Sequence, residues 1–268
     1  MKACGLSVSY LPNRRTFDRR LKTIYTDIKE RISTMGNLFV IERLVRPPRV
    51  VATDTALLKS NGKVWHKSSM KQDVVPRSGI DTDARWGRSR TKGWIFGYKL
   101  HMISSTDPLS TVVPLSADVT TANISDKPAY TDTVSSLLPE TLKKIHYMVA
   151  DPGFSGKKQY DFSLRKQFQL VCPVKRYKNT PEKRLKLADF YESALGQVIY
   201  SKRKISIEPL IEHLKSVFRI DPVPVKGLDK VRSIVLLDVL LYQITVYYNC
   251  KVLKSDNPRR MIKYMIDC

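Results

Sequence analysis

The chain has 268 residues, enough to bury a full hydrophobic core in one large domain or two small ones. It is 42% hydrophobic and 27% charged without a low-complexity tract, which is typical of a globular protein rather than a disordered one. The 47 Lys and Arg against 25 Asp and Glu give a net charge of +22, which favours a polyanionic partner such as a nucleic acid. A basic surface of the ribosomal kind is the alternative.

Four scattered cysteines, Cys4, Cys172, Cys250 and Cys268, form no CxxC pair and have no histidine at zinc spacing. We therefore expect free thiols in a reducing cytoplasm and no structural zinc. The N-terminus has no sustained apolar run typical of a signal peptide. The most hydrophobic stretch, residues 234–248, is too short and too polar for a membrane span, so a buried helix is predicted there and no membrane partner.

The first expected element is a helix over residues 16–45, where apolar residues recur at three- and four-residue steps among many arginines. It could lie on DNA or be a packed helix with a solvated basic face. The pair Pro47-Pro48 predicts a boundary. A strand follows at 50–55, and the polar region 59–92 reads as loop with short pieces of structure.

Later strands are expected at 93–104, 111–120, 144–150 and 168–174, which are rich in apolar, β-branched and aromatic residues. Helices are expected at 126–138, 157–167, 206–218 and 228–254, and the basic segment 175–204 reads as irregular. In the helix at 206–218, Ser206 is expected to cap the N-terminus and Pro209 to lie in the first turn. Residues 221–227 read as a linker.

This order predicts an α/β fold, because three early strands suggest an antiparallel meander and the later alternation suggests parallel crossovers. A mixed sheet flanked by helices results, as in the RNase H-like fold. That fold carries acidic residues at the ends of its first and fourth strands and on a late helix.

Three acidic residues stand at such positions. Asp54 lies at the end of the first apolar run, Asp151 follows the strand at 144–150, and Glu208 lies in the helix at 206–218 with Lys215 seven residues on. Carboxylates from separate elements can hold two divalent metals for phosphoryl transfer. Each Asp taken alone could equally be a turn or cap residue.

Several segments carry a resemblance to a known family: VVATDTALLKSNGKVWH, GIDTDARWGRSRTKGWIFGYKLH, HYMVADPGFSG and RKISIEPLIEHLKSVF with the apolar helix after it. The chain resembles bacterial insertion-sequence transposases of the RNase H-like DDE class over roughly residues 50–250. The resemblance implies that Asp54 and Asp151 bind two Mg²⁺ ions between them and that Glu208 completes the second site. Mn²⁺ could substitute, since both ions prefer carboxylate oxygens.

Glu212 lies one turn after Glu208 and is the competing third acid. The family places a Lys seven residues after its Glu, which Lys215 satisfies. The family also has an Arg and a Tyr before the Glu. In this chain Lys204 holds the position expected for the Arg, with Arg203 beside it, and Tyr200 is displaced by one residue from the position expected for the Tyr.

Tyr200, Arg203, Lys204 and Lys215 are thus the candidate DNA-binding residues. Between residues 157 and 204 the chain carries 13 Lys and Arg against four acids, which suits a track for DNA backbone or a solvated face. The resemblance implies double-stranded DNA as partner, both element ends and target, and a homodimer when two ends are synapsed.

Other polar and aromatic residues have structural interpretations. Asp81 and Asp83 are expected to form salt bridges in a basic loop, and His101 to be a structural residue rather than part of the metal site. Trp94 is expected in the core, whereas Trp86 could stack on a base or pack.

The expected organisation is an N-terminal helical segment at 1–47, a catalytic domain at 48–227 and a C-terminal helix at 228–268 that packs on it. The N-terminal segment looks like the remainder of an end-binding region. Two further hypotheses are therefore a truncated transposase remnant that binds DNA without catalysis and another RNase H-like nuclease. The expected location is the bacterial cytoplasm, on the nucleoid.

Overall fold

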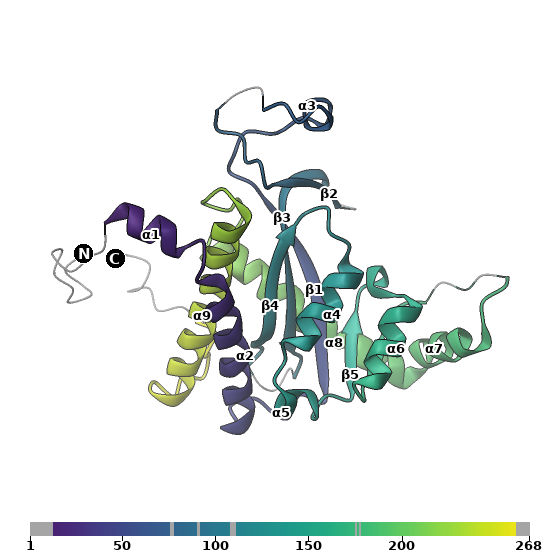
Figure 1. Cartoon of the computed structure of the whole chain (residues 1–268). Helices are drawn as coiled ribbons and strands as arrows, with labels where there is room; N and C mark the ends of the chain where they lie inside the picture. Colours follow the sequence, from purple (N-terminus) through teal and green to yellow (C-terminus); the bar gives the residue numbers. More distant parts are fainter. Residues whose placement is uncertain are drawn as a thin grey trace.

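The computed structural model describes residues 13–75, 78–89, 92–107, 111–174, 176 and 178–260. Cys4, Cys268 and the ends of the predicted terminal segments lie outside these residues. Six strands form a single sheet with helices on both sides (Figure 1). The strands are β1 (Val50–Lys59), β2 (Arg85–Ser89), β3 (Gly93–Ser105), β4 (Pro114–Thr121), β5 (Tyr147–Ala150) and β6 (Gln169–Val171).

The sheet is mixed, with β1 at its centre. On one side β1 pairs antiparallel with β3, and on the other it pairs parallel with β5, which in turn pairs parallel with β6. The outer edge of β3 pairs antiparallel with β2 through its first residues and with β4 through its later ones. The predicted RNase H-like arrangement, antiparallel strands followed by parallel ones, is confirmed.

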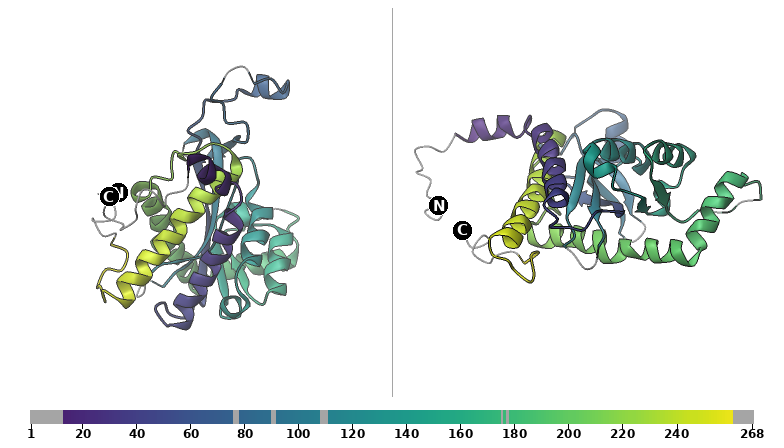
Figure 2. Two further views of the ribbon diagram at one scale, coloured as in Figure 1. Left: turned by 60° about the vertical axis from the view of Figure 1, so that its left-hand side comes forward. Right: turned by 90° about the horizontal axis from the view of Figure 1, so that it is seen from below.

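Helices cover the two faces of this sheet (Figure 2). On one face α4 (Asp126–Ser135) contacts β3 and β4, and α6 (Lys157–Arg165) contacts β6. On the other face α8 (Ala194–Val217) runs across β1, β5 and β6. Central strands with helices on both faces must be apolar on both sides, which explains why β1 and β5 are apolar runs rather than alternating patterns.

A second helical layer packs beside β4. It consists of α2 (Tyr25–Ile41) and α9 (Leu228–Lys251), which contact each other and the strand, and the short basic helix α1 (Arg14–Arg20) precedes it. By length and composition α9 is apolar enough to cross a membrane, but one of its faces is buried in this layer. The predicted buried helix is confirmed for that face only, because Leu237, Leu241 and Ile244 on the other face are exposed.

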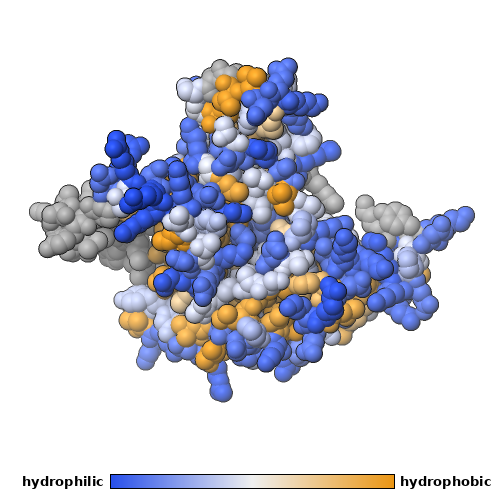
Figure 3. Space-filling view, in the orientation of Figure 1, coloured by the Kyte–Doolittle hydropathy of each residue, from blue (hydrophilic) through white to orange (hydrophobic). Residues whose placement is uncertain are grey.

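Short elements complete the fold: α3 (Lys67–Lys71), α5 (Pro139–Leu142), a 3₁₀ turn (Pro152–Phe154) and α7 (Glu182–Glu192), which packs on α8. Hydrophilic side chains cover the two outlying ends, over α1 and over α7, whereas hydrophobic ones gather along the lower part of the face in Figure 3. Strand β2 was not predicted, since its sequence RWGRS lacks a clear period.

The predicted irregular segment 175–204 is wrong from residue 182 onward, and so is the helix start at Ser206. Residues 182–192 are helical, and α8 begins at Ala194, where the Ser193 side chain accepts a hydrogen bond from the Gly196 amide. Ser206 is instead buried inside the helix, and its hydroxyl donates to the Lys202 carbonyl. Glu208 therefore lies in the middle of a 24-residue helix rather than at its first turn.

Candidate active site

Asp54 and Asp151 are neighbours because the strands that carry them are adjacent and parallel. The register pairs Thr53 of β1 with Ala150 of β5, and each aspartate is the next residue along the chain. Asp54 is buried, and its Oδ1 accepts a hydrogen bond from the Thr55 amide at 2.8 Å. The strand β1 continues to Lys59, beyond the expected end at residue 55, so Asp54 lies in its middle, whereas Asp151 directly follows the last residue of β5. Parallel pairing of the two strands thus brings two carboxylates to one point at the sheet's centre.

The third acid reaches this point from α8, through an arginine. The Arg203 guanidinium donates from one amino group to Asp54 Oδ2 at 2.7 Å and from the other to Glu208 Oε1 at 2.8 Å. The side chains of Asp54 and Arg203 are only 12% and 16% exposed, whereas that of Glu208 is 41% exposed. Arg203 therefore bridges the first strand and the helix acid.

Burial and charge act against each other at Asp54. Burial raises the pKa of this carboxyl to about 6, the Arg203 guanidinium opposes the rise, and the nearby Asp151 carboxylate adds to it. For Arg203, burial alone would lower the pKa, but the carboxylates of Asp54 and Glu208 outweigh it and raise the pKa. The site therefore favours a positive charge between its acids.

The acids open into a groove of about 650 Å³. Its lining includes five carboxylates and five cations, so it carries no net charge although the whole chain is +22. The charged lining residues are Asp54, Asp126, Asp151, Glu208 and Glu212, with Arg88, Lys92, Lys99, Arg203 and Lys215.

Sequence reasoning missed Asp126 and Lys99, which form an ion pair of 2.9 Å in this groove. Asp126 opens α4 and Lys99 lies in β3, so only the packing of α4 on the sheet brings them here. A Cβ at Gly153 would lie 3.1 Å from the Asp126 carboxylate. The one available signal was the DPGFSG segment, whose glycine lets the chain after Asp151 pass close to Asp126.

The four candidate DNA-binding residues separate into two pairs. Arg203 and Lys215 line the groove, and the Lys215 ammonium lies 3.4 Å from Glu212 Oε1. Lys204 is exposed and Tyr200 packs edge-on against Tyr191, with ring centroids 5.1 Å apart, and neither lines the groove.

The donor set fits a divalent metal in kind, because carboxylate oxygens are the ligands that Mg²⁺ and Mn²⁺ prefer. Within the described part of the chain, however, no three Asp, Glu, His or Cys side chains converge closely enough to hold a metal ion. Arg203 explains why: its guanidinium lies between Asp54 and Glu208 and is itself the cation there.

The predicted salt bridges of Asp81 and Asp83 are wrong. Asp81 is buried and accepts hydrogen bonds from neutral groups, the Tyr98 and Ser60 hydroxyls, each at 2.8 Å. Asp83 accepts from the Leu228 amide at 2.8 Å, at the start of α9. These acids fasten the loop after β1 to the C-terminal helix, because neutral backbone and hydroxyl donors surround them.

His101 has a structural role, as predicted. It is buried, pairs with Thr55 rather than Asp54 in the sheet, and its Nε2 lies 2.9 Å from the Thr120 hydroxyl. Because neighbouring strand positions face opposite sides of a sheet, His101 points away from the side taken by Asp54. Burial, and then the Lys99 charge, lower its pKa to about 4, so the ring is neutral near pH 7.

The core position predicted for Trp94 is wrong. Its side chain is exposed near the outer end of the β2–β3 hairpin, and the Lys67 ammonium lies 3.8 Å from the ring centroid. The short helix α3 lies at this end of the sheet in Figure 1, and the neighbour that it gives the ring is the charged Lys67 side chain. Trp86 instead packs against Phe96, and its indole N–H donates to the Trp65 carbonyl at 3.0 Å.

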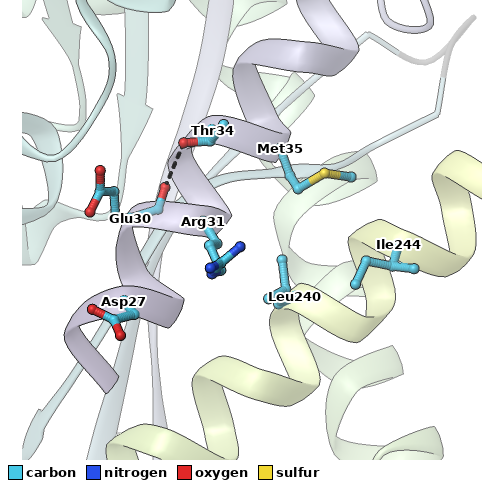
Figure 4. Close-up of a pocket in the computed structure, with 7 residues that line it drawn as sticks. All are labelled: Asp27, Glu30, Arg31, Thr34, Met35, Leu240 and Ile244. Atoms are coloured by element: carbon cyan, nitrogen blue, oxygen red, sulfur yellow. Dashed lines mark hydrogen bonds between the residues drawn. The ribbon is translucent and has the colours of Figure 1, made fainter. Parts of the chain in front are cut away.

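A second hollow lies between α2 and α9, away from the acids (Figure 4). Met35, Leu240 and Ile244 form its apolar part, and Asp27 and Glu30 lie on the α2 side. The Thr34 hydroxyl donates to the Glu30 carbonyl within the helix at 3.0 Å. This is a gap between packed helices without a cluster of catalytic groups.

Comparison with known proteins gives one strong match, to a family profile, and weak matches to solved structures. No curated protein matches the chain. Among solved structures it is similar to a Mos1 transposase paired-end complex with left transposon end, with 13% identity, 90% of this chain and 64% of that chain covered, and a TM-score of 0.27. A pre-cleavage Mos1 transpososome gives 12% identity, 81% and 63% coverage and a TM-score of 0.27.

The chain thus spans less than two thirds of the length of those proteins, and the fold rests on the strand order described above rather than on these low scores. The sequence profile described as Transposase DDE domain, by contrast, matches residues 48–244, which include Asp54, Asp151, Glu208 and Lys215. By this match across most of its length, the chain belongs to the Transposase DDE domain family.

Proposed function

We propose that this transposase catalyses metal-dependent DNA strand cleavage and strand transfer for an insertion sequence, with Asp54, Asp151 and Glu208 as its catalytic carboxylates. One observation carries the proposal: Asp54 within the central strand β1 and Asp151 directly after β5 lie side by side, and Glu208 joins Asp54 through a shared guanidinium. Glu208 is preferred over Glu212, since Glu212 contacts only Lys215 and its side chain is 72% exposed.

Asp54 and Asp151 would hold two Mg²⁺ ions between them, and Glu208 would complete the second site. When bound, such ions supply Lewis-acid activation of an attacking hydroxyl and stabilise charge on the leaving oxygen. The rest of the work falls to residues of the chain. The sheet fixes the two aspartates, α8 fixes Glu208, and burial of Asp54 keeps bulk water from the inner edge of the site.

Double-stranded DNA is the proposed partner, as element end and as target. The cations of the groove, Lys215 among them, would contact phosphates, and the chain's +22 charge supplies sequence-independent affinity. Because two ends must be joined, we propose a homodimer in the complex with DNA, acting on the nucleoid in the cytoplasm.

The test is a nicking assay. Purified protein is incubated with labelled element-end DNA in Mg²⁺, in Mn²⁺ and in chelator, beside Asp54→Ala and Glu208→Ala. Metal-dependent nicking that both substitutions abolish is the expected result. DNA binding without any cleavage would identify a remnant, and cleavage that survives Glu208→Ala would remove Glu208 from the site.

A further inference from the structure

Arg203 occupies the position that links the acids. Its two terminal amino groups are committed to Asp54 and Glu208, at 2.7 and 2.8 Å. Its Nε–H is buried and has no acceptor among the described residues. An arginine in its final, fully satisfied environment would not leave a buried donor without a partner, since such a donor costs about 1–3 kcal/mol.

We infer that Arg203 is an internal counter-ion that holds the acids in the metal-free protein and must leave them before metal binds. This inference rests on the proposed function. The carboxylate oxygens that accept from Arg203 belong to two of the three acids assigned to the metals. A guanidinium and a divalent cation on those oxygens repel each other and compete for lone pairs, so the contacts of Arg203 oppose metal binding.

A DNA phosphate is the ligand that would draw Arg203 away. Guanidinium groups bind phosphate oxygens through two parallel N–H bonds, and the Nε–H that is unpaired here belongs to that fork. The groove beside Arg203 is lined by further cations, including Lys215, that suit a phosphate backbone. Metal binding would therefore be weak in the free protein and strengthened by DNA, which limits cleavage to the assembled complex.

The two events are thermodynamically coupled, so DNA must raise metal affinity by the same factor by which metal raises DNA affinity. Removing the guanidinium should break this coupling. The protein without Arg203 would bind metal tightly whether or not DNA is present.

The experiment is calorimetric titration of MnCl₂ into the full chain. The proteins are wild type, Arg203→Met, which keeps most of the side-chain stem without the charge, and Lys202→Met as the matched control. Lys202 is the preceding cation on α8 and lines a different hollow, near Pro47 and Pro48. We expect Arg203→Met to bind Mn²⁺ about tenfold more tightly than wild type, and Lys202→Met within about twofold of it.

Added element-end DNA should tighten Mn²⁺ binding to wild type but leave Arg203→Met almost unchanged. Arg203→Lys, which retains the charge, should stay close to wild type without DNA and serves if the methionine variant does not fold. Unchanged or weaker Mn²⁺ binding by Arg203→Met, with wild type still nicking DNA, would overturn the counter-ion role alone. Wild type that neither binds Mn²⁺ nor nicks DNA would overturn the proposed function as well.

Discussion

Replacing Asp54 with asparagine should make the metal-free protein more stable at neutral pH. Burial raises the pKa of Asp54 in the folded chain from its ordinary 3.8 to about 6. Between these values the folded protein binds the proton and the unfolded chain releases it. The free energy of unfolding that Asp54 contributes is therefore fully present below pH 3.8 and is lost as the pH rises through 6.

The size of this loss follows from the shift. At 1.36 kcal/mol for each pH unit, the rise of the pKa from 3.8 to about 6 gives a cost on the order of 3 kcal/mol at pH 8 for keeping the carboxylate charged. The Asp54 side chain is only 12% exposed, so solvent screens little of this electrostatic cost. The pKa is raised even with the Arg203 guanidinium beside the carboxylate, so the favourable contact with Arg203 is already counted. Asparagine resembles the protonated acid in shape and charge. The variant should thus gain on the order of 3 kcal/mol at pH 8 and under about 1 kcal/mol at pH 4.

Urea unfolding of wild type and Asp54→Asn between pH 4 and 8, with chelator present, measures the difference. Glu212→Gln is the control, because its exposed carboxylate lies in the same groove and should change stability by no more than about 0.5 kcal/mol. A variant less stable than wild type at pH 8, or a gain that does not grow with pH, would refute the reasoning.

Three further outcomes are expected. Glu208→Gln should lower the rate of metal-dependent nicking at least about 100-fold, since even the loss of a residue that only hydrogen-bonds a metal ligand can cost that much. Glu212→Gln should leave the rate within a few fold of wild type. A large loss in Glu212→Gln with a small one in Glu208→Gln would make Glu212 the third acid. Ser193→Ala should lower the free energy of unfolding by about 1 kcal/mol, measured with urea, because the cap of α8 is lost; unchanged stability would mean that the cap contributes nothing. Tyr98→Phe should cost about 1–3 kcal/mol, because the buried Asp81 loses a hydroxyl donor at 2.8 Å, and a neutral result in the same assay would contradict that role.

Several elements could be predicted because local sequence carries their signal. The apolar runs of β1 and β5 indicate strands buried on both faces, and the periodic segments of α2 and α9 indicate packed helices. Asp54 within the first of these runs and Asp151 directly after the second could be singled out for the same reason. Parallel pairing of β1 with β5 then brings the two positions together.

Other elements had no comparable local signal. Helix α7 and the first half of α8 are largely exposed and polar, so no apolar period marked them. Strand β2 forms through pairing with β3, and Trp94 is exposed near the outer end of that hairpin, where the Lys67 ammonium of α3 lies over its ring. These features depend on what packs, or does not pack, against them.

By itself the sequence determined the family and singled out Asp54 and Asp151, because apolar β-branched runs and the acids within or directly after them are local properties of the chain. Only the tertiary structure decided what lies between the acids. Helix α8 begins at Ala194 rather than Ser206, so Arg203 and Glu208 belong to one rigid helix that crosses β1. The direction in which that helix points Arg203 follows from its packing on the sheet, which no residue spacing encodes.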